Sequence, residues 1–96
     1  MSLDTCRKQI DEIDGEILSL LGRRNDVVKE IALLKIRASL PVIDPDREAV
    51  VLRRASRTTS IGEYPVRVYF EIIAHARELQ QQMVREARTQ AVEVPA

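Results

Sequence analysis

The chain has 96 residues, which is enough for one folded domain and too few for two. Hydrophobic residues make up 45% and charged residues 31%, a composition typical of globular proteins rather than of disordered segments. Fifteen Lys and Arg balance fifteen Asp and Glu, so no net charge attracts DNA or RNA. Aromatic residues are only 3% and glycines number three, which argues against a strand-rich fold. We therefore expect an all-helical domain that binds no nucleic acid.

The single cysteine, Cys6, excludes an intramolecular disulfide and a cysteine-based zinc site. The first residues lack a cationic start followed by an apolar run, and no apolar stretch reaches the roughly 18 residues of a membrane helix. The sequence contains no glycine-rich phosphate loop and no metal-ligand cluster. These features predict a soluble, cytoplasmic protein with no metal, no cofactor and no membrane partner.

The first segment has apolar residues at alternating spacings of three and four, the pattern of one long amphipathic helix. They are Leu3, Cys6, Ile10, Ile13, Ile17, Leu20, Val27, Ile31, Leu34 and Ala38. Asp4 suits the positive end of the helix dipole and Ser39-Leu40-Pro41 ends the helix, which predicts a helix over 3–38. Such a helix is about 54 Å long, whereas a compact monomer of this size is about 30 Å across. We therefore predict an obligate, interleaved homodimer.

Two further helices follow. Asp44 is an N-cap acceptor and Pro45 suits the first helical position, which predicts a short helix over 45–56. A polar connection with a glycine leads to a third helix, expected from about Pro65 to Arg88. A single domain then covers residues 1–90, and residues 91–96 are expected to form a disordered tail.

At two positions the apolar spacing continues but the residue is polar: Arg24 in the first helix and Gln80 in the third. A buried guanidinium needs an internal acid or an external anion, because an uncompensated buried charge is costly. Lys35 lies on nearly the same helix face as Arg24, about 16 Å along the axis. Two cations beside Val28 and Ile31 favour a small dianionic ligand. A structural ion pair or a register-fixing polar layer would also explain Arg24 alone.

The predicted second helix carries Asp44, Arg47 and Glu48 on one face. By itself this pattern also fits a helix cap followed by a solvated surface. Arg7 lies about 25 Å from Arg24 along the first helix and on a different face. The two arginines can therefore meet around one small ligand only if Arg7 comes from the other subunit.

The spaced residues resemble the all-helical, AroQ-type chorismate mutases. The match consists of Arg7, Ile10-Asp11, Ile13-Asp14, Ile17-Leu18, Leu20-Leu21, Arg24, Ile31, Lys35, Pro41, Asp44, Arg47-Glu48, Glu71-Ile72-Ile73, Arg77 and Leu79-Gln80. The resemblance implies three helices per chain and two intertwined chains that build two shared sites. It also implies the conversion of chorismate to prephenate, without a cofactor, in the shikimate branch of aromatic amino acid biosynthesis.

The resemblance further implies roles for single residues. Arg24 and the partner's Arg7 would hold the two substrate carboxylates, and Arg47 would assist. Lys35 and Gln80 would donate hydrogen bonds to the ether oxygen of the enolpyruvyl group. The rearrangement is pericyclic, so it needs a held conformer and donors where charge develops rather than a nucleophile or a proton shuttle.

Asp44 and Glu48 would approach the ring hydroxyl of the substrate. The sequence departs from the family at Ala76, where many relatives carry a serine four residues before the glutamine of the third helix. A shift of one residue in the alignment of that helix would nominate Gln81 in place of Gln80, but the unbroken apolar spacing favours Gln80.

Three other functions are compatible with this scaffold. An isochorismate pyruvate lyase would release pyruvate and form salicylate, and a related mutase would act on 4-amino-4-deoxychorismate. The face formed by Asp44, Arg47 and Glu48 looks more like that of the mutases. A non-catalytic helical dimerisation or regulatory module is the alternative outside enzymology. Arg24 and Gln80 argue against it, because apolar residues at these positions would pack better.

Overall fold

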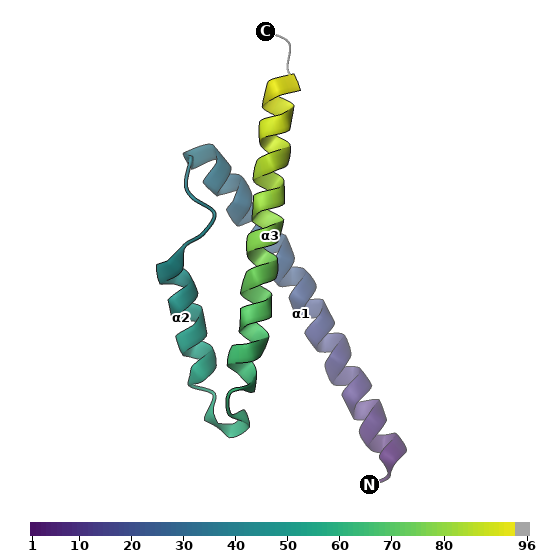
Figure 1. Ribbon diagram of the computed structural model, residues 1–96. Helices are drawn as coiled ribbons and strands as arrows, with labels where there is room; N and C mark the ends of the chain where they lie inside the picture. The colour runs from purple at the N-terminus through teal and green to yellow at the C-terminus, as the bar shows by residue number, and fades with distance from the viewer. Residues whose placement is uncertain (94–96) are drawn as a thin grey trace.

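The computed structural model describes the backbone of residues 1–93 and the side chains of residues 1–58 and 60–90. These residues form three α-helices and one short 3-10 helix, without a strand, so the predicted all-helical fold is confirmed. In chain order the elements are α1 (Leu3–Ala38), α2 (Pro45–Ser56), η1 (Thr59–Ile61) and α3 (Tyr64–Glu93) (Figure 1).

Helix α1 has the bounds that the sequence predicts. Its N-cap is Ser2, whose Oγ accepts a hydrogen bond from the Thr5 amide at 3.1 Å. At the other end Ser39 adopts the left-handed conformation with φ 56°, and the Leu40 amide donates to the Lys35 carbonyl at 2.9 Å. This cap ends α1, and the chain then turns back to enter α2 (Figure 1).

Helix α2 also has its predicted bounds, with Asp44 as the N-cap and Pro45 in the first turn. The Arg47 amide donates to Asp44 Oδ1 at 3.1 Å, as expected for such a cap. In the connection to α3, Gly62 has φ 65°, a conformation that costs glycine little. The cap and this turn place α2 beside α3.

Helix α3 is longer than the sequence predicts, because it runs from Tyr64 to Glu93 rather than ending near Arg88. No proline or glycine occurs between Arg88 and Glu93, so the sequence contains no local signal that would end the helix earlier. The helix thus includes the first three residues of the predicted tail. Residues 94–96 of that tail lie outside the described residues.

The core of one chain is small, and α3 packs against both α1 and α2. Its buried apolar residues are Val28 and Ala32 from α1, Ala55 from α2 and Ala76 from α3. Gln80 is the buried polar residue among the described side chains, with 7% of its surface exposed. The small side chains bring the helices together without filling the space between them, which leaves room for a cavity.

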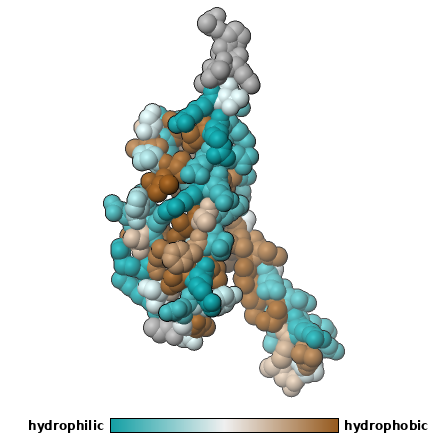
Figure 2. All heavy atoms as spheres, viewed as in Figure 1, coloured by the Kyte–Doolittle hydropathy of each residue, from teal (hydrophilic) through white to brown (hydrophobic). Residues whose placement is uncertain are grey.

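The first half of α1 extends away from the other two helices (Figure 1). The chain therefore measures 68 × 28 × 15 Å with a radius of gyration of 18.0 Å, whereas a compact domain of this length has about 13 Å. Apolar side chains lie along this extension in Figure 2, and Ile10, Ile13, Ile17 and Leu20 are 49–56% exposed. Within residues 1–93, no helix has the length and apolar character needed to span a membrane.

Candidate active site

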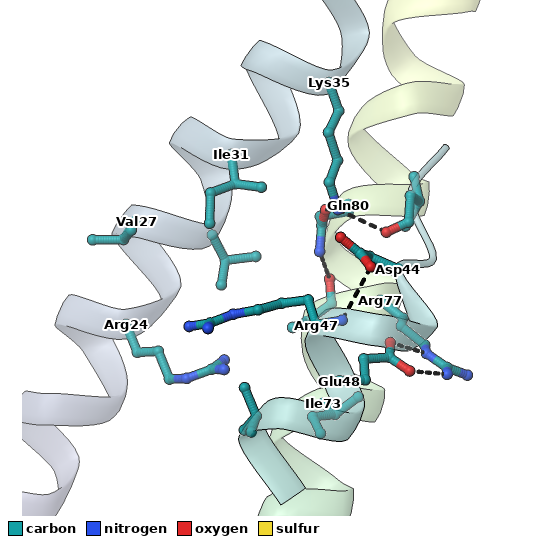
Figure 3. A pocket seen from close by; sticks show the side chains of 14 residues that line it. Arg24, Val27, Ile31, Lys35, Asp44, Arg47, Glu48, Ile73, Arg77 and Gln80 are labelled. Atoms are coloured by element: carbon teal, nitrogen blue, oxygen red, sulfur yellow. Dashed lines mark hydrogen bonds and ion pairs between the residues drawn. The ribbon is translucent and has the colours of Figure 1, made fainter. Parts of the chain in front are cut away.

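A cavity of about 340 Å³ lies between the three helices (Figure 3). It brings together the polar residues that the sequence singles out within one chain: Arg24, Lys35, Asp44, Arg47, Glu48 and Gln80. Arg7 does not line it and is exposed on the extended part of α1. The placement of Arg7 agrees with the expectation that this residue cannot reach the site of its own chain.

Helix α1 provides two half-buried cations, Arg24 and Lys35, on one face. Val28 and Ile31 lie between them and form part of an apolar wall. None of the hydrogen bonds or ion pairs among the described side chains involves the Arg24 guanidinium. An internal acid therefore does not account for this arginine in the described part of the chain.

Lys35 and Gln80 face each other across α1 and α3. Lys35 Nζ donates to Gln80 Oε1 at 2.8 Å and to the Val42 carbonyl at 2.7 Å. Gln80 Nε2 donates to the Ala76 carbonyl at 3.1 Å. An ammonium has three N–H groups and an amide nitrogen has two, so these bonds leave each side chain one further donor for a ligand.

The placement of the two glutamines favours Gln80 over Gln81 as the residue of this cavity. Gln80 is buried and lines the cavity, whereas Gln81 is half-buried and lines a different depression, together with Ile43 and Val84. The contact from Gln80 to Ala76 uses the backbone carbonyl of that residue. The backbone of Ala76 therefore helps to orient the Gln80 amide.

Helix α2 contributes Asp44, Arg47 and Glu48. The carboxylate of Asp44 caps α2 at the cavity edge. The side chain of Arg47 extends toward α1, and that of Arg24 extends toward α2 (Figure 3). Two like charges repel in this arrangement unless an anion lies between them. The pair therefore favours a negatively charged ligand.

The structure adds Arg77 of α3, to which sequence reasoning assigned no role. Its Nε donates to Glu48 Oε2 at 2.7 Å, and its Nη2 pairs with Glu48 Oε1. These hydrogen bonds hold the pKa of the Glu48 carboxyl below its ordinary value, against the opposing effect of burial. The same bonds raise the pKa of the guanidinium. Glu48 is therefore ionised in the folded chain at neutral pH.

The charges around the cavity do not cancel. Four cationic side chains and two carboxylates line it, which gives a local formal charge of +2 in a chain with no net charge. The Arg77–Glu48 pair contributes nothing to this sum. The excess comes from Arg24, Lys35 and Arg47 against Asp44, and it matches a small dianion.

The sequence matches the family model described as chorismate mutase type II over residues 6–81. The chain belongs to this family. It is 32% identical over 90 residues to a chorismate mutase of Methanocaldococcus jannaschii, covering 90% of this chain and 91% of the relative. The predicted family is thus confirmed.

Two other relatives are informative. The chain is 35% identical over 88 residues to the bifunctional chorismate mutase/prephenate dehydratase of Aquifex aeolicus, covering 84% of this chain and 24% of that protein. It is 36% identical over 55 residues to a 4-amino-4-deoxychorismate mutase of Streptomyces venezuelae, covering 57% of this chain and 53% of the relative. No solved structure gave a significant match.

The family resemblance implies that Gln80 donates to the charge that develops on the ether oxygen, and on that role replacing it by leucine is expected to lower kcat by about a hundredfold. The thermal midpoint should not fall, since Lys35 keeps the Val42 carbonyl as an acceptor and a buried amide gives way to an apolar side chain of similar size. Gln81→Leu is the matched control and should retain wild-type turnover. Loss of folding in Gln80→Leu would instead make Gln80 a structural residue.

The Arg77–Glu48 pair predicts a dependence of stability on pH. Because the pKa of Glu48 is lowered from 4.5 on folding, its contribution is complete above that value and disappears as the pH falls through the folded pKa. As the pH is lowered below about 4.5, the free energy of unfolding measured with urea should therefore fall more steeply in the wild type than in Arg77→Gln. Arg85→Gln, which changes an exposed arginine of α3, should keep the wild-type slope. Equal slopes in wild type and Arg77→Gln would contradict the assignment.

Proposed function

We propose that the chain catalyses the rearrangement of chorismate to prephenate as a homodimer, without a cofactor, and that each site includes Arg7 of the partner subunit. The observation that carries this proposal is the cavity in which Arg24, Lys35, Arg47 and Gln80 converge on an apolar wall with a net positive charge. Membership in the chorismate mutase type II family supplies the reaction.

The substrate carries two carboxylates, and the site provides cations for both. Arg24 and Arg47 extend into the space between α1 and α2 (Figure 3). Arg24 binds one carboxylate, the partner's Arg7 binds the other, and Arg47 assists. Guanidinium groups suit this task because they donate two parallel hydrogen bonds to a carboxylate. Binding at both ends holds the flexible substrate in its reactive diaxial conformer.

The reaction breaks the ether carbon–oxygen bond while a carbon–carbon bond forms, so atoms and electrons balance within one molecule. Negative charge grows on the ether oxygen as its bond to the ring lengthens. The remaining donors of Lys35 Nζ and Gln80 Nε2 point to this oxygen in the proposed complex and stabilise the charge. The hydrogen bond between Lys35 and Gln80 fixes both side chains before the substrate binds, which lowers the cost of arranging them.

The ring hydroxyl meets acceptors from α2. Asp44 and Glu48 are carboxylates at the wall of the cavity, and each can accept a hydrogen bond from a hydroxyl. Asp44 uses one oxygen for the helix cap, which orients the other. These acceptors complete the contacts to a molecule that carries two carboxylates, an ether oxygen and a hydroxyl.

The homodimer is supported by the extended part of α1. Its apolar residues Ile10, Ile13, Ile17 and Leu20 are half exposed in one chain, and apolar surface of this extent is normally covered by another subunit. Arg7 lies on the same extension. A second copy therefore covers the apolar face and delivers its Arg7 in one arrangement. Light scattering at micromolar concentration should give twice the mass of the chain.

We also propose that the protein acts in the cytoplasm, in the biosynthesis of phenylalanine and tyrosine. The free thiol of Cys6 suits a reducing compartment. The relative from Aquifex aeolicus, whose name joins chorismate mutase to prephenate dehydratase, supports the assignment to this pathway.

The experiment that tests the activity uses three substrates. Purified protein is incubated separately with chorismate, isochorismate and 4-amino-4-deoxychorismate, and the products are identified by mass spectrometry. We expect prephenate from chorismate as the fastest reaction. Salicylate from isochorismate as the main product would identify a lyase instead. Absence of any product would favour the non-catalytic module.

A further inference from the structure

We propose that Arg77, through its pair with Glu48, makes the site prefer a ring hydroxyl over a ring ammonium group. This inference rests on the proposed function, since it concerns the group at the ring position that faces Glu48. Arg77 acts here as a positioning and specificity residue and is not assigned a contact with the reacting atoms.

The geometry gives Arg77 control of the Glu48 carboxylate. Nε and Nη2 of Arg77 engage the two carboxylate oxygens of Glu48, so the contact is bidentate. The two residues lie on different helices, α3 and α2, and both line the cavity. Their dashed contacts appear at the edge of the site in Figure 3. A planar guanidinium in this arrangement fixes the rotamer of the carboxylate as well as its charge.

The pair leaves Glu48 able to accept a hydrogen bond and unable to act as an isolated negative charge. Each carboxylate oxygen has a second lone pair, so a neutral hydroxyl can still donate to it. A protonated amine gains most from an unpaired carboxylate, and the adjacent guanidinium offsets that attraction. The Glu48 side chain is 20% exposed and that of Arg77 is 42% exposed, so water screens the Arg77 charge in part and the carboxylate less.

Three of the four other charged groups of the cavity act in the same direction. Arg24, Lys35 and Arg47 repel a cation, whereas Asp44, a carboxylate that no described side chain pairs, attracts one. Without Arg77 the lining would hold three cations and two unpaired carboxylates, and the net charge would fall from +2 to +1. Removing this guanidinium therefore favours an ammonium group beside Glu48 more than it favours a hydroxyl.

The experiment compares kcat/KM for chorismate and for 4-amino-4-deoxychorismate at pH 7, where a primary amine is protonated. The wild type should favour chorismate. In Arg77→Gln the ratio should move toward the amino substrate by at least about tenfold. Arg77→Lys keeps the charge and should restore most of the wild-type preference. Arg85→Gln, on the same helix and outside this cavity, should leave the ratio unchanged.

A second variant, Glu48→Gln, keeps the inference testable even if Arg77→Gln fails to fold. Glu48→Gln retains an acceptor oxygen for the hydroxyl but leaves the Arg77 charge unbalanced, so the ratio should move the opposite way, further toward chorismate. Unchanged ratios in both variants, with equal losses for the two substrates, would reduce the pair to a structural contact and overturn the inference. An inactive wild type would instead refute the proposed function, so the two failures are distinct.

Discussion

Arg24→Ala and Lys35→Ala are each expected to remove about 3 kcal/mol or more of transition-state stabilisation, a loss of more than a hundredfold in kcat/KM. Arg24 makes no hydrogen bond or ion pair within the described part of the chain, so its N–H groups remain available to bind a substrate carboxylate. Lys35 donates to Gln80 and to a backbone carbonyl, and its third N–H group is the donor that the proposed mechanism assigns to the ether oxygen. Both variants should remain folded.

The matched controls are Arg23→Ala and Arg37→Ala, which remove an exposed cation one or two positions away on the same helix. They should retain near-wild-type kcat/KM, and circular dichroism should show helical content equal to that of the wild type in all four variants. Wild-type rates in Arg24→Ala or Lys35→Ala would refute the assignment of the site. Equal losses in the controls would indicate a general effect of charge.

Mixing two inactive variants is expected to restore activity. Arg7→Ala and Arg24→Ala should each be inactive as homodimers, because each site then lacks one carboxylate-binding arginine. In a mixed dimer, one site combines the intact Arg24 of the first chain with the partner's Arg7 and is complete, while the other lacks both. Random exchange of subunits makes half of the dimers mixed, so the pool should recover about a quarter of wild-type turnover.

The subunits are exchanged by dilution into mild denaturant followed by refolding together, and each variant refolded alone is the control. Recovery near one quarter identifies a shared site. No recovery, with mixed dimers demonstrated by native mass spectrometry of a tagged and an untagged chain, would contradict the shared site and mean that Arg7 acts within its own chain. An active Arg7→Ala homodimer would mean that Arg7 has no role in the site.

The bounds of α1 and α2 could be predicted because local chemistry ends these helices. Ser39 and Pro41 follow α1, and Asp44 and Pro45 open α2. The end of α3 was predicted too early, because nothing between Arg88 and Glu93 interrupts a helix and only the loss of regular apolar spacing suggested an end. Regular apolar spacing indicates where a helix packs against a neighbour, and a helix can continue beyond that part.

The polar breaks in the apolar pattern indicated Arg24 and Gln80 as candidate site residues, and the structure brings both to one cavity. Arg77 carried no comparable signal, because its partner Glu48 lies 29 residues away on another helix. Helical periodicity relates residues on one face of a single helix, so it cannot reveal a pair that depends on how α2 and α3 align. Cross-helix contacts of this kind require the tertiary arrangement.

If the proposed homodimer forms, the extension of α1 makes catalysis depend on protein concentration. In that homodimer the same stretch of helix forms the contact between subunits and supplies Arg7 to the partner's site. Dissociation therefore exposes its apolar residues and removes Arg7 from both sites at once. Specific activity should then decline on dilution below the dissociation constant, and this decline marks the affinity between subunits directly. A cell that makes too little of this chain would lose turnover more steeply than in proportion to its amount.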